Sequence, residues 1–152
     1  MTCASERDTP RRMPEESVTP DLVELVRQAF DAGNRHNADA IIGLHAPDAV
    51  WDLSDEGLGT FEGVAAIKGW IEDWFGVWVD LSLDVLDVVD LGHGVVFSRV
   101  REEGRLADGG GQVEQQRAWV ILGGQGKIAR TAIYLDIAAG CAAAERLAEE
   151  RE

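Results

Sequence analysis

The stretch Ala46-Pro47-Asp48-Ala49-Val50-Trp51-Asp52-Leu53 decides the fold, together with the residues up to Trp78 that follow it. Its last four residues predict a short strand, with Trp51 and Leu53 on one face and Asp52 on the other. A glycine-bearing turn over 59–63 comes next, and residues 62–78 carry apolar side chains at helical spacing. With helices before this stretch and strands after it, the order predicts an α+β fold in which a curved antiparallel sheet wraps around helices.

The flanking segments supply the other expected elements. Helices are predicted over 19–33, with Thr19 as N-cap, and over 38–45, where Pro47 prevents continuation. The apolar residues change phase near Val85, which predicts a β-bulge in the strand that contains it. The later strands are predicted over 81–88, 95–103, 112–122 and 127–137, and a terminal helix over 138–152.

Length and composition bound the class of protein. A chain of 152 residues supports one domain, predicted over 19–152 after a disordered tail over 1–18. That tail has no apolar run, so we expect neither a signal peptide nor a membrane anchor, and Met13 is a second candidate start of translation. The net charge of -14 argues against nucleic acid and acidic membranes as partners. Cys3 and Cys141 lie near opposite ends of the chain, which predicts a reduced, cytoplasmic protein.

The turn near Gly124 sets which side chains of the last two long strands share a face. A two-residue turn at Gly124-Gln125 would pair Trp119 with Arg130. One face of these two strands, with Arg117, Trp119 and Tyr134, is then predicted to point outward, half solvated and able to contact a partner. The face predicted to point inward carries mostly small and aliphatic residues, which are Gln116, Ala118, Val120, Leu122, Thr131, Ile133 and Leu135.

Four short motifs follow one another in this order of elements. They are Ala46-Pro47-Asp48-Ala49-Val50-Trp51-Asp52, Gly59-Thr60-Phe61-Glu62-Gly63, Gly126-Lys127-Ile128 and Tyr134-Leu135-Asp136. From Asp21 to its end, the chain resembles the SnoaL-like branch of the NTF2-like superfamily, which includes ketosteroid isomerases, polyketide cyclases and epoxide hydrolases alongside members without chemistry. The resemblance implies a cystatin-like α+β cone, whose N-terminal helices close an apolar pocket, and commonly a dimer through the outer sheet face.

These implications give a predicted pocket and a predicted interface. A small, largely apolar ligand would occupy the pocket. A homodimer would form through the outer sheet face, with Phe97, Arg99, Arg101, Arg117, Trp119 and Tyr134. The predicted pocket residues are Trp51, Leu53, Trp70, Trp74, Ser98, Gln116, Ala118, Val120, Thr131, Ile133 and Leu135.

The positions that carry catalytic groups in relatives are changed in this chain. The resemblance would place an isomerase base at Leu53 and the two oxyanion-binding groups at Ala29 or Phe30 and at Ala118. Epoxide hydrolase chemistry would need a carboxylate where Arg101 stands, and a guanidinium does not release its proton near neutral pH.

Three carboxylates remain as candidates for a single acid/base group, namely Asp52, Glu114 and Asp136. Asp52 lies one residue from the isomerase base position, which puts it on the opposite face of its strand. For Asp136, in Tyr134-Leu135-Asp136, a structural role is favoured. We expect structural roles for His36, His45 and His93, and no cofactor or metal, because no pair of ligands has a suitable spacing.

Three functions stay open on the sequence alone. The first is a protein that binds a small apolar molecule in the cone without chemistry. The second is an enzyme of the cyclase, isomerase or hydrolase type that uses one carboxylate with a raised pKa. The third is an interaction module that uses the outer sheet face, of which a homodimer is the simplest form.

Overall fold

The computed structural model describes residues 21–151, so the predicted tail and the question of Met13 lie outside it. Its elements are α1 (Leu22–Asn34), α2 (Ala38–Ile42), β1 (His45–Asp52), the 3₁₀ helix η1 (Ser54–Glu56), β2 (Thr60–Glu62), α3 (Val64–Gly76), β3 (Ser82–Gly92), β4 (Val95–Arg105), β5 (Gln112–Gly124), β6 (Lys127–Tyr134) and α4 (Ile137–Glu150). The strands form one sheet in the order β2-β1-β6-β5-β4-β3. All neighbours are antiparallel except β1 and β6.

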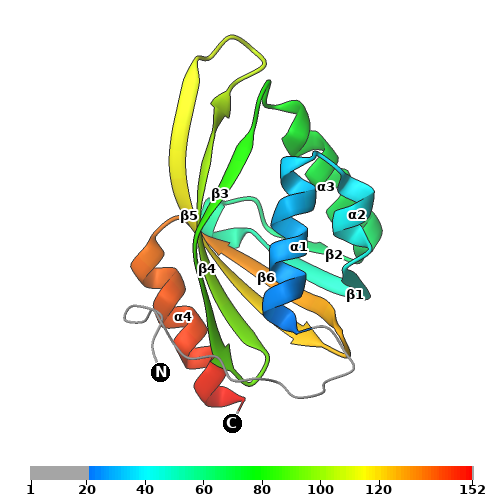
Figure 1. Ribbon diagram of the computed structural model, residues 1–152, viewed down its shortest axis with the longest axis vertical. Coiled ribbons are helices and arrows are strands. Elements are labelled where there is room, and N and C mark those ends of the chain that lie inside the picture. The colour runs from blue at the N-terminus through cyan, green and yellow to red at the C-terminus, as the bar shows by residue number, and fades with distance from the viewer. Residues whose placement is uncertain (1–20, 152) are drawn as a thin grey trace.

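The sheet curves around α1, α2 and α3, and α4 packs on its other side (Figure 1). The larger core cluster fills the concave side and includes Val26 and Phe30 of α1, Ile67 and Ile71 of α3, and Trp119 of β5. A second cluster lies under α4 on the convex side. The predicted α+β cone of the NTF2-like type is confirmed.

The helix and strand boundaries differ from the prediction near the N-terminus. The N-cap of α1 is Asp21, whose side chain accepts a hydrogen bond from the backbone of Val23 at 3.3 Å, while Thr19 lies outside the described residues. Helix α2 ends at Ile42, and His45 already belongs to β1, where it pairs with Ile128 of β6. Pro47 therefore lies in a strand, within the register irregularity between His45 and Val50.

The predicted register of β5 and β6 is wrong, and so is the predicted inner face of β5. Gly124 pairs with Lys127, so the turn is Gln125-Gly126, and a register shift follows at Leu122 and Gly123. Trp119 consequently pairs with Ile133. The later turn alone would move the pairing by two residues, which leaves the predicted faces of β5 unchanged. The one-residue bulge moves the pairing by one more residue and so exchanges the two faces of β5. The bulge predicted in the earlier strand is confirmed between Val85 and Asp87 of β3.

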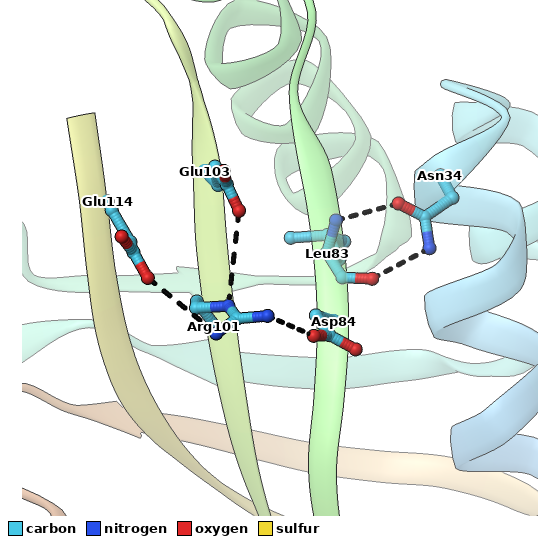
Figure 2. A network of polar contacts seen from close by, with 6 residues as sticks. All are labelled: Asn34, Leu83, Asp84, Arg101, Glu103 and Glu114. Atoms are coloured by element: carbon cyan, nitrogen blue, oxygen red, sulfur yellow. Dashed lines mark hydrogen bonds and ion pairs between the residues drawn. The ribbon is translucent and has the colours of Figure 1, made fainter. Parts of the chain in front are cut away.

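The free edge of β3 is closed at its start by the last residue of α1. The Asn34 side chain donates to the Leu83 carbonyl oxygen at 2.9 Å and accepts from the Leu83 backbone nitrogen at 2.7 Å (Figure 2). This amide replaces the missing neighbouring strand at that residue and fixes α1 to the sheet.

Helix α4 packs very closely on the convex side of the sheet. A side chain at Gly140 would collide with Ala118, so the helix backbone lies almost on the strand. Phe97, Ala118 and Val120 are buried beneath α4. The convex face of β4 to β6 is thus covered by the chain itself over much of its apolar area.

Two further observations bear on the class of protein. None of the helices within 21–151 has the length and apolar character needed to cross a membrane. Cys141 is disulfide-bonded, contrary to the expectation of reduced cysteines, and Cys3, the other cysteine, lies outside the described residues. Disulfides are rare in the reducing cytosol, so the cysteines no longer support a cytoplasmic location.

Candidate functional site

A cavity of about 30 Å³ lies between the concave face of the sheet and α1 to α3. Its wall is almost entirely apolar, and four aromatic side chains contribute to it: Phe30, Trp51, Trp74 and Trp119. The other lining residues are Ala29, Gly33, Ile41, His45, Ile71, Leu83, Ile121, Ile128 and Thr131.

The aromatic side chains hold one another at fixed angles. Trp119 meets Phe30 edge to face, with ring centroids 5.0 Å apart, and meets Trp51 in the same way at 5.7 Å. On α3, Trp74 stacks on Trp70 at 5.6 Å. Edge-to-face contacts of this kind favour one relative orientation of the rings, so the wall of the cavity is well defined.

His45 lines the cavity with both ring nitrogens already bonded. Its Nδ1 lies 2.8 Å from the carbonyl oxygen of Ile41, which can only accept, so this nitrogen carries the proton. Its Nε2 accepts from the indole N–H of Trp51 at 3.0 Å. Burial lowers the pKa of His45, which agrees with a neutral ring. The predicted structural role fits this geometry.

Thr131 is the other polar lining residue, and its hydroxyl is unused. Only 2 % of the residue is exposed, and within 21–151 its side chain forms no hydrogen bond. Ser98, on the same face, is different because its hydroxyl donates to the carbonyl oxygen of Asp87 at 2.9 Å. The cavity therefore has one free hydroxyl in an apolar wall.

The cavity approaches the surface between α1 and α3. Ala29 and Trp74 are the two lining residues that are partly exposed, and the others are buried. Trp74 is thus the large side chain whose movement would open the cavity to solvent.

The predicted pocket residues are divided between the two sides of the sheet. Trp51, Trp74 and Thr131 line the cavity. Leu53, Trp70, Ser98 and Ile133 lie on the concave side without lining it. Ala118 and Val120 lie under α4 on the convex side, because of the register shift in β5. Gln116 is exposed, and Leu135 is 46 % exposed.

The three predicted carboxylates have polar or exposed surroundings. Asp52 accepts from the Ser54 hydroxyl and from Arg130 at 2.9 Å; the pKa of Asp52 is lowered, first by Ser54 and also by Arg130. Glu114 is exposed and lies 3.7 Å from Arg101 on the convex side, where Arg101 also contacts Asp84 (Figure 2).

Asp136, the third candidate, caps α4. Its side chain accepts from the backbone nitrogen of Ala139 at 3.2 Å, and the residue is exposed. None of the three candidates has the buried, apolar environment that raises the pKa of a carboxyl group.

Glu102 has that environment and was not among the predicted residues. It is 4 % exposed, and burial raises its pKa despite a hydrogen bond from Gln115 at 3.0 Å and the nearby Arg117. Arg117 itself bonds to Glu56 of η1 at 3.3 Å. The alternation of Val96, Ser98, Val100 and Glu102 along one face of β4 is the sequence signal for this burial.

Glu102 and the cavity occupy different parts of the concave face. Glu102 does not line the cavity; it pairs with Gln115 towards the β4–β5 loop. The chain before β3 covers this region, since a Cβ at Gly104 would lie only 2.9 Å from the carbonyl oxygen of Asp80. The concave face thus has an aromatic end and a polar end.

The residues predicted for a dimer interface are also divided. Trp119 points into the concave core, and Phe97 is buried under α4. Arg99 and Arg101 remain on the convex side, bonded to Asp87 and Asp84 respectively, whereas Arg117 lies on the concave side with Glu102. The homodimer through the outer sheet face itself stays a prediction.

Comparisons with known proteins agree with this fold. The sequence profile of the SnoaL-like domain matches residues 26–131. The chain belongs to the SnoaL-like family. Among curated proteins, no relative matches it.

Several solved structures are similar to this SnoaL-like protein. A proposed polyketide cyclase from Sinorhizobium meliloti shares 30% identity, with 72% of this chain and 93% of that chain covered and a TM-score of 0.60. An uncharacterized cystatin-fold protein from Novosphingobium aromaticivorans shares 18% identity, with 75% of this chain and 97% of that chain covered and a TM-score of 0.67. A hypothetical protein with a ketosteroid isomerase-like fold from Catenulispora acidiphila, in complex with trimethylamine, shares 16% identity. The match covers 81% of this chain and 92% of that chain, with a TM-score of 0.67.

Proposed function

We propose that this SnoaL-like protein binds a small, largely apolar molecule in the cavity at the aromatic end of the concave face. The observation that carries the proposal is the enclosure of an apolar space by Phe30, Trp51, Trp74 and Trp119. Aromatic walls of this kind are typical of small-molecule sites, because they bury the ligand's apolar surface and fix its orientation.

The size of the cavity limits how the ligand enters. About 30 Å³ holds one or two water-sized groups, whereas ligand sites commonly measure about 300 to 1,000 Å³. A ligand of ordinary size must therefore widen the space between α1 and α3. Trp74 is the side chain placed to move, since it is partly exposed and rests on Trp70.

The test is a titration with benzene, followed through the indole N–H signals in a ¹H–¹⁵N spectrum. We expect saturable shifts for Trp51 and Trp119, which line the cavity, and none for Trp78, which does not. Replacing Ala29 with Leu should block the opening and weaken binding more than ten-fold. Replacing Ala40 with Leu is the matched control, because Ala40 packs on the same core without lining the cavity. Equal binding by both variants would contradict the proposal.

A second candidate function is proton-transfer chemistry of the cyclase or isomerase type. It is favoured by Glu102, the one buried acidic residue within 21–151, and by the likeness to a proposed polyketide cyclase. A carboxylate at this position could take a proton from the carbon beside a carbonyl group, and the resulting carboxyl group could return it to the same or another atom. Gln115 would orient the carboxyl group and Arg117 would influence its charge.

Deuterium exchange tests this second candidate without knowledge of the natural substrate. In deuterated water, we expect the protein to accelerate incorporation of deuterium beside the carbonyl of cyclopentanone. Glu102→Gln should reduce the rate to that of buffer, whereas Asp52→Asn should not change it. If Glu102→Gln keeps the acceleration, or if the unaltered protein gives none, this candidate fails and the ligand-binding proposal is unaffected.

A further inference from the structure

We propose that the ligand of the cavity is uncharged and carries one oxygen atom, of a ketone or an alcohol, that forms a hydrogen bond with Thr131. This inference rests on the proposed binding function and names the chemical class of the ligand.

His45 and Trp51, two polar residues of the cavity wall, already bond to protein groups. Both nitrogens of His45 are bonded, one to the Ile41 carbonyl oxygen and one to the Trp51 indole N–H. These bonds also fix the ring as neutral, since a second N–H would point at the Trp51 donor. His45 and Trp51 therefore shape the cavity but cannot bond to a ligand without breaking this pair.

Two other lining residues, Thr131 and Trp119, have polar groups without a hydrogen bond within 21–151. Thr131 lines the cavity, is 2 % exposed, and its side chain forms no hydrogen bond within 21–151. Trp119, another lining residue, has a buried indole N–H without a hydrogen bond. Because Ile121 pairs with Thr131 and Trp119 with Ile133, Trp119 and Thr131 are diagonal neighbours on the concave face.

The Thr131 hydroxyl and the Trp119 indole N–H are thus two free donors on neighbouring residues of the concave face. A buried donor without a partner is costly, and a ligand oxygen that accepts from it removes that cost. A molecule without a polar atom would leave the Thr131 hydroxyl unpaired.

The charge of the cavity wall also limits the ligand. No Asp, Glu, Lys or Arg lines the cavity, and the remaining ionisable residue, His45, is neutral. A charged ligand would lose its hydration without gaining a counter-charge, which is strongly unfavourable in an apolar site. The acidic Glu102 is too far along the sheet to serve, because it faces Gln115 outside the cavity wall.

Three probes of similar ring size test the inference: cyclopentanone, cyclopentane and the cyclopentylammonium ion. Thr131→Val keeps the shape of the side chain and removes the hydroxyl, and it suits a strand. We expect this variant to bind cyclopentanone about five-fold more weakly than the unaltered protein does, as for one net hydrogen bond, and to bind cyclopentane within two-fold. Thr131→Ser, which restores the hydroxyl, should recover most of the loss for cyclopentanone.

The outcomes separate this inference from the function on which it rests. Equal effects of Thr131→Val on cyclopentanone and cyclopentane would overturn the role of Thr131 and leave the binding site itself intact. Binding of cyclopentylammonium as tight as that of cyclopentanone would overturn the restriction to uncharged ligands. If none of the three probes shifts the Trp51 and Trp119 signals, the binding function fails together with this inference.

Discussion

The two ends of the concave face differ in how much hydrogen-bonding capacity their buried ionisable groups have left unused. At the aromatic end, His45 is 5 % exposed and both of its nitrogens are bonded. At the polar end, Glu102 is 4 % exposed, and within 21–151 its carboxylate accepts one hydrogen bond, from Gln115. Burial alone therefore does not make a reactive group. The unused hydrogen-bonding capacity of that group decides what it can do.

The same cause shifts the two groups in opposite directions. Burial disfavours the charged form, so it lowers the pKa of His45 and raises the pKa of Glu102. Near Glu102, the Arg117–Glu56 ion pair is already balanced, so a neutral Glu102 leaves this cluster without net charge. Both ends of the face thus favour neutral groups, and the following substitutions separate their contributions.

The largest effect is expected at the aromatic end. Trp119→Ala removes the ring that contacts both Phe30 and Trp51 and leaves a large void in the core. The free energy of unfolding should fall by about 3 to 5 kcal/mol in urea titrations. Trp70→Ala is the control, because Trp70 is partly exposed, and it should cost clearly less. Equal losses would mean that the concave core is not organised around Trp119.

His45→Ala should have the next largest effect. It leaves the Trp51 indole N–H and the Ile41 carbonyl oxygen buried without partners, which costs about 1 to 3 kcal/mol per group at neutral pH. Because the pKa of His45 is lowered from its ordinary value of 6.5, the stabilisation by the neutral ring is present above that pH. It is lost as the pH falls through the folded-state pKa.

Urea titrations of the unaltered protein and His45→Ala between pH 7.5 and 4.5 check this pH dependence. The difference in unfolding free energy between the two proteins should shrink as the pH falls. A difference that grows on acidification would contradict a neutral His45.

Glu102→Gln should have a smaller effect with the opposite dependence on pH. The pKa of Glu102 is raised from 4.5, so its contribution to stability is fully present below pH 4.5 and is lost as the pH rises through the folded-state pKa. Glutamine resembles the protonated acid at every pH. The variant should therefore gain stability relative to the unaltered protein as the pH rises from 4.5.

Glu103→Gln is the matched control, since Glu103 follows Glu102 but lies on the convex side near Arg101. Urea titrations across this range should show no such relative gain for Glu103→Gln. If both variants behave alike, Glu102 is not specially placed.

The smallest effect is expected on the convex side, away from both ends. Asp87→Asn breaks the ion pair with Arg99, in which the two side chains are 49 % and 38 % exposed. Such pairs contribute about 0 to 1 kcal/mol, and salt screens them. Thermal unfolding at low and high salt should give a small difference that disappears at high salt. A loss as large as that of His45→Ala would show that the convex side is more than a solvated surface.

Sequence reasoning reached the fold but not the arrangement of the site. The order of helices and strands around Trp51 was enough to predict an α+β cone, because alternation and helical spacing are local properties. The face that each residue of β5 presents is not a local property: the extra residue Ala129 of β6, between the pairs Gly123–Ile128 and Leu122–Arg130, places Trp119 instead of Ala118 on the concave side. Thr131 was assigned correctly to the inner face because the error fell on β5 alone.

Glu102 illustrates the other kind of error. A glutamate in a strand is expected at the surface, so the sequence alone does not single out Glu102. Only the packing of the chain near Asp80 over this part of β4, together with the pairing to Gln115, makes Glu102 buried. Such burial depends on contacts between segments far apart in sequence.

The central claim is that the binding site lies at the aromatic end and not at the polar end. A crystal pressurised with xenon tests it most directly, because xenon occupies apolar cavities of this kind and is located by its scattering. The account predicts one main xenon site, bounded by Trp51, Trp119 and Thr131, with none beside Glu102. A main site next to Glu102, or no xenon within the cone, would contradict it.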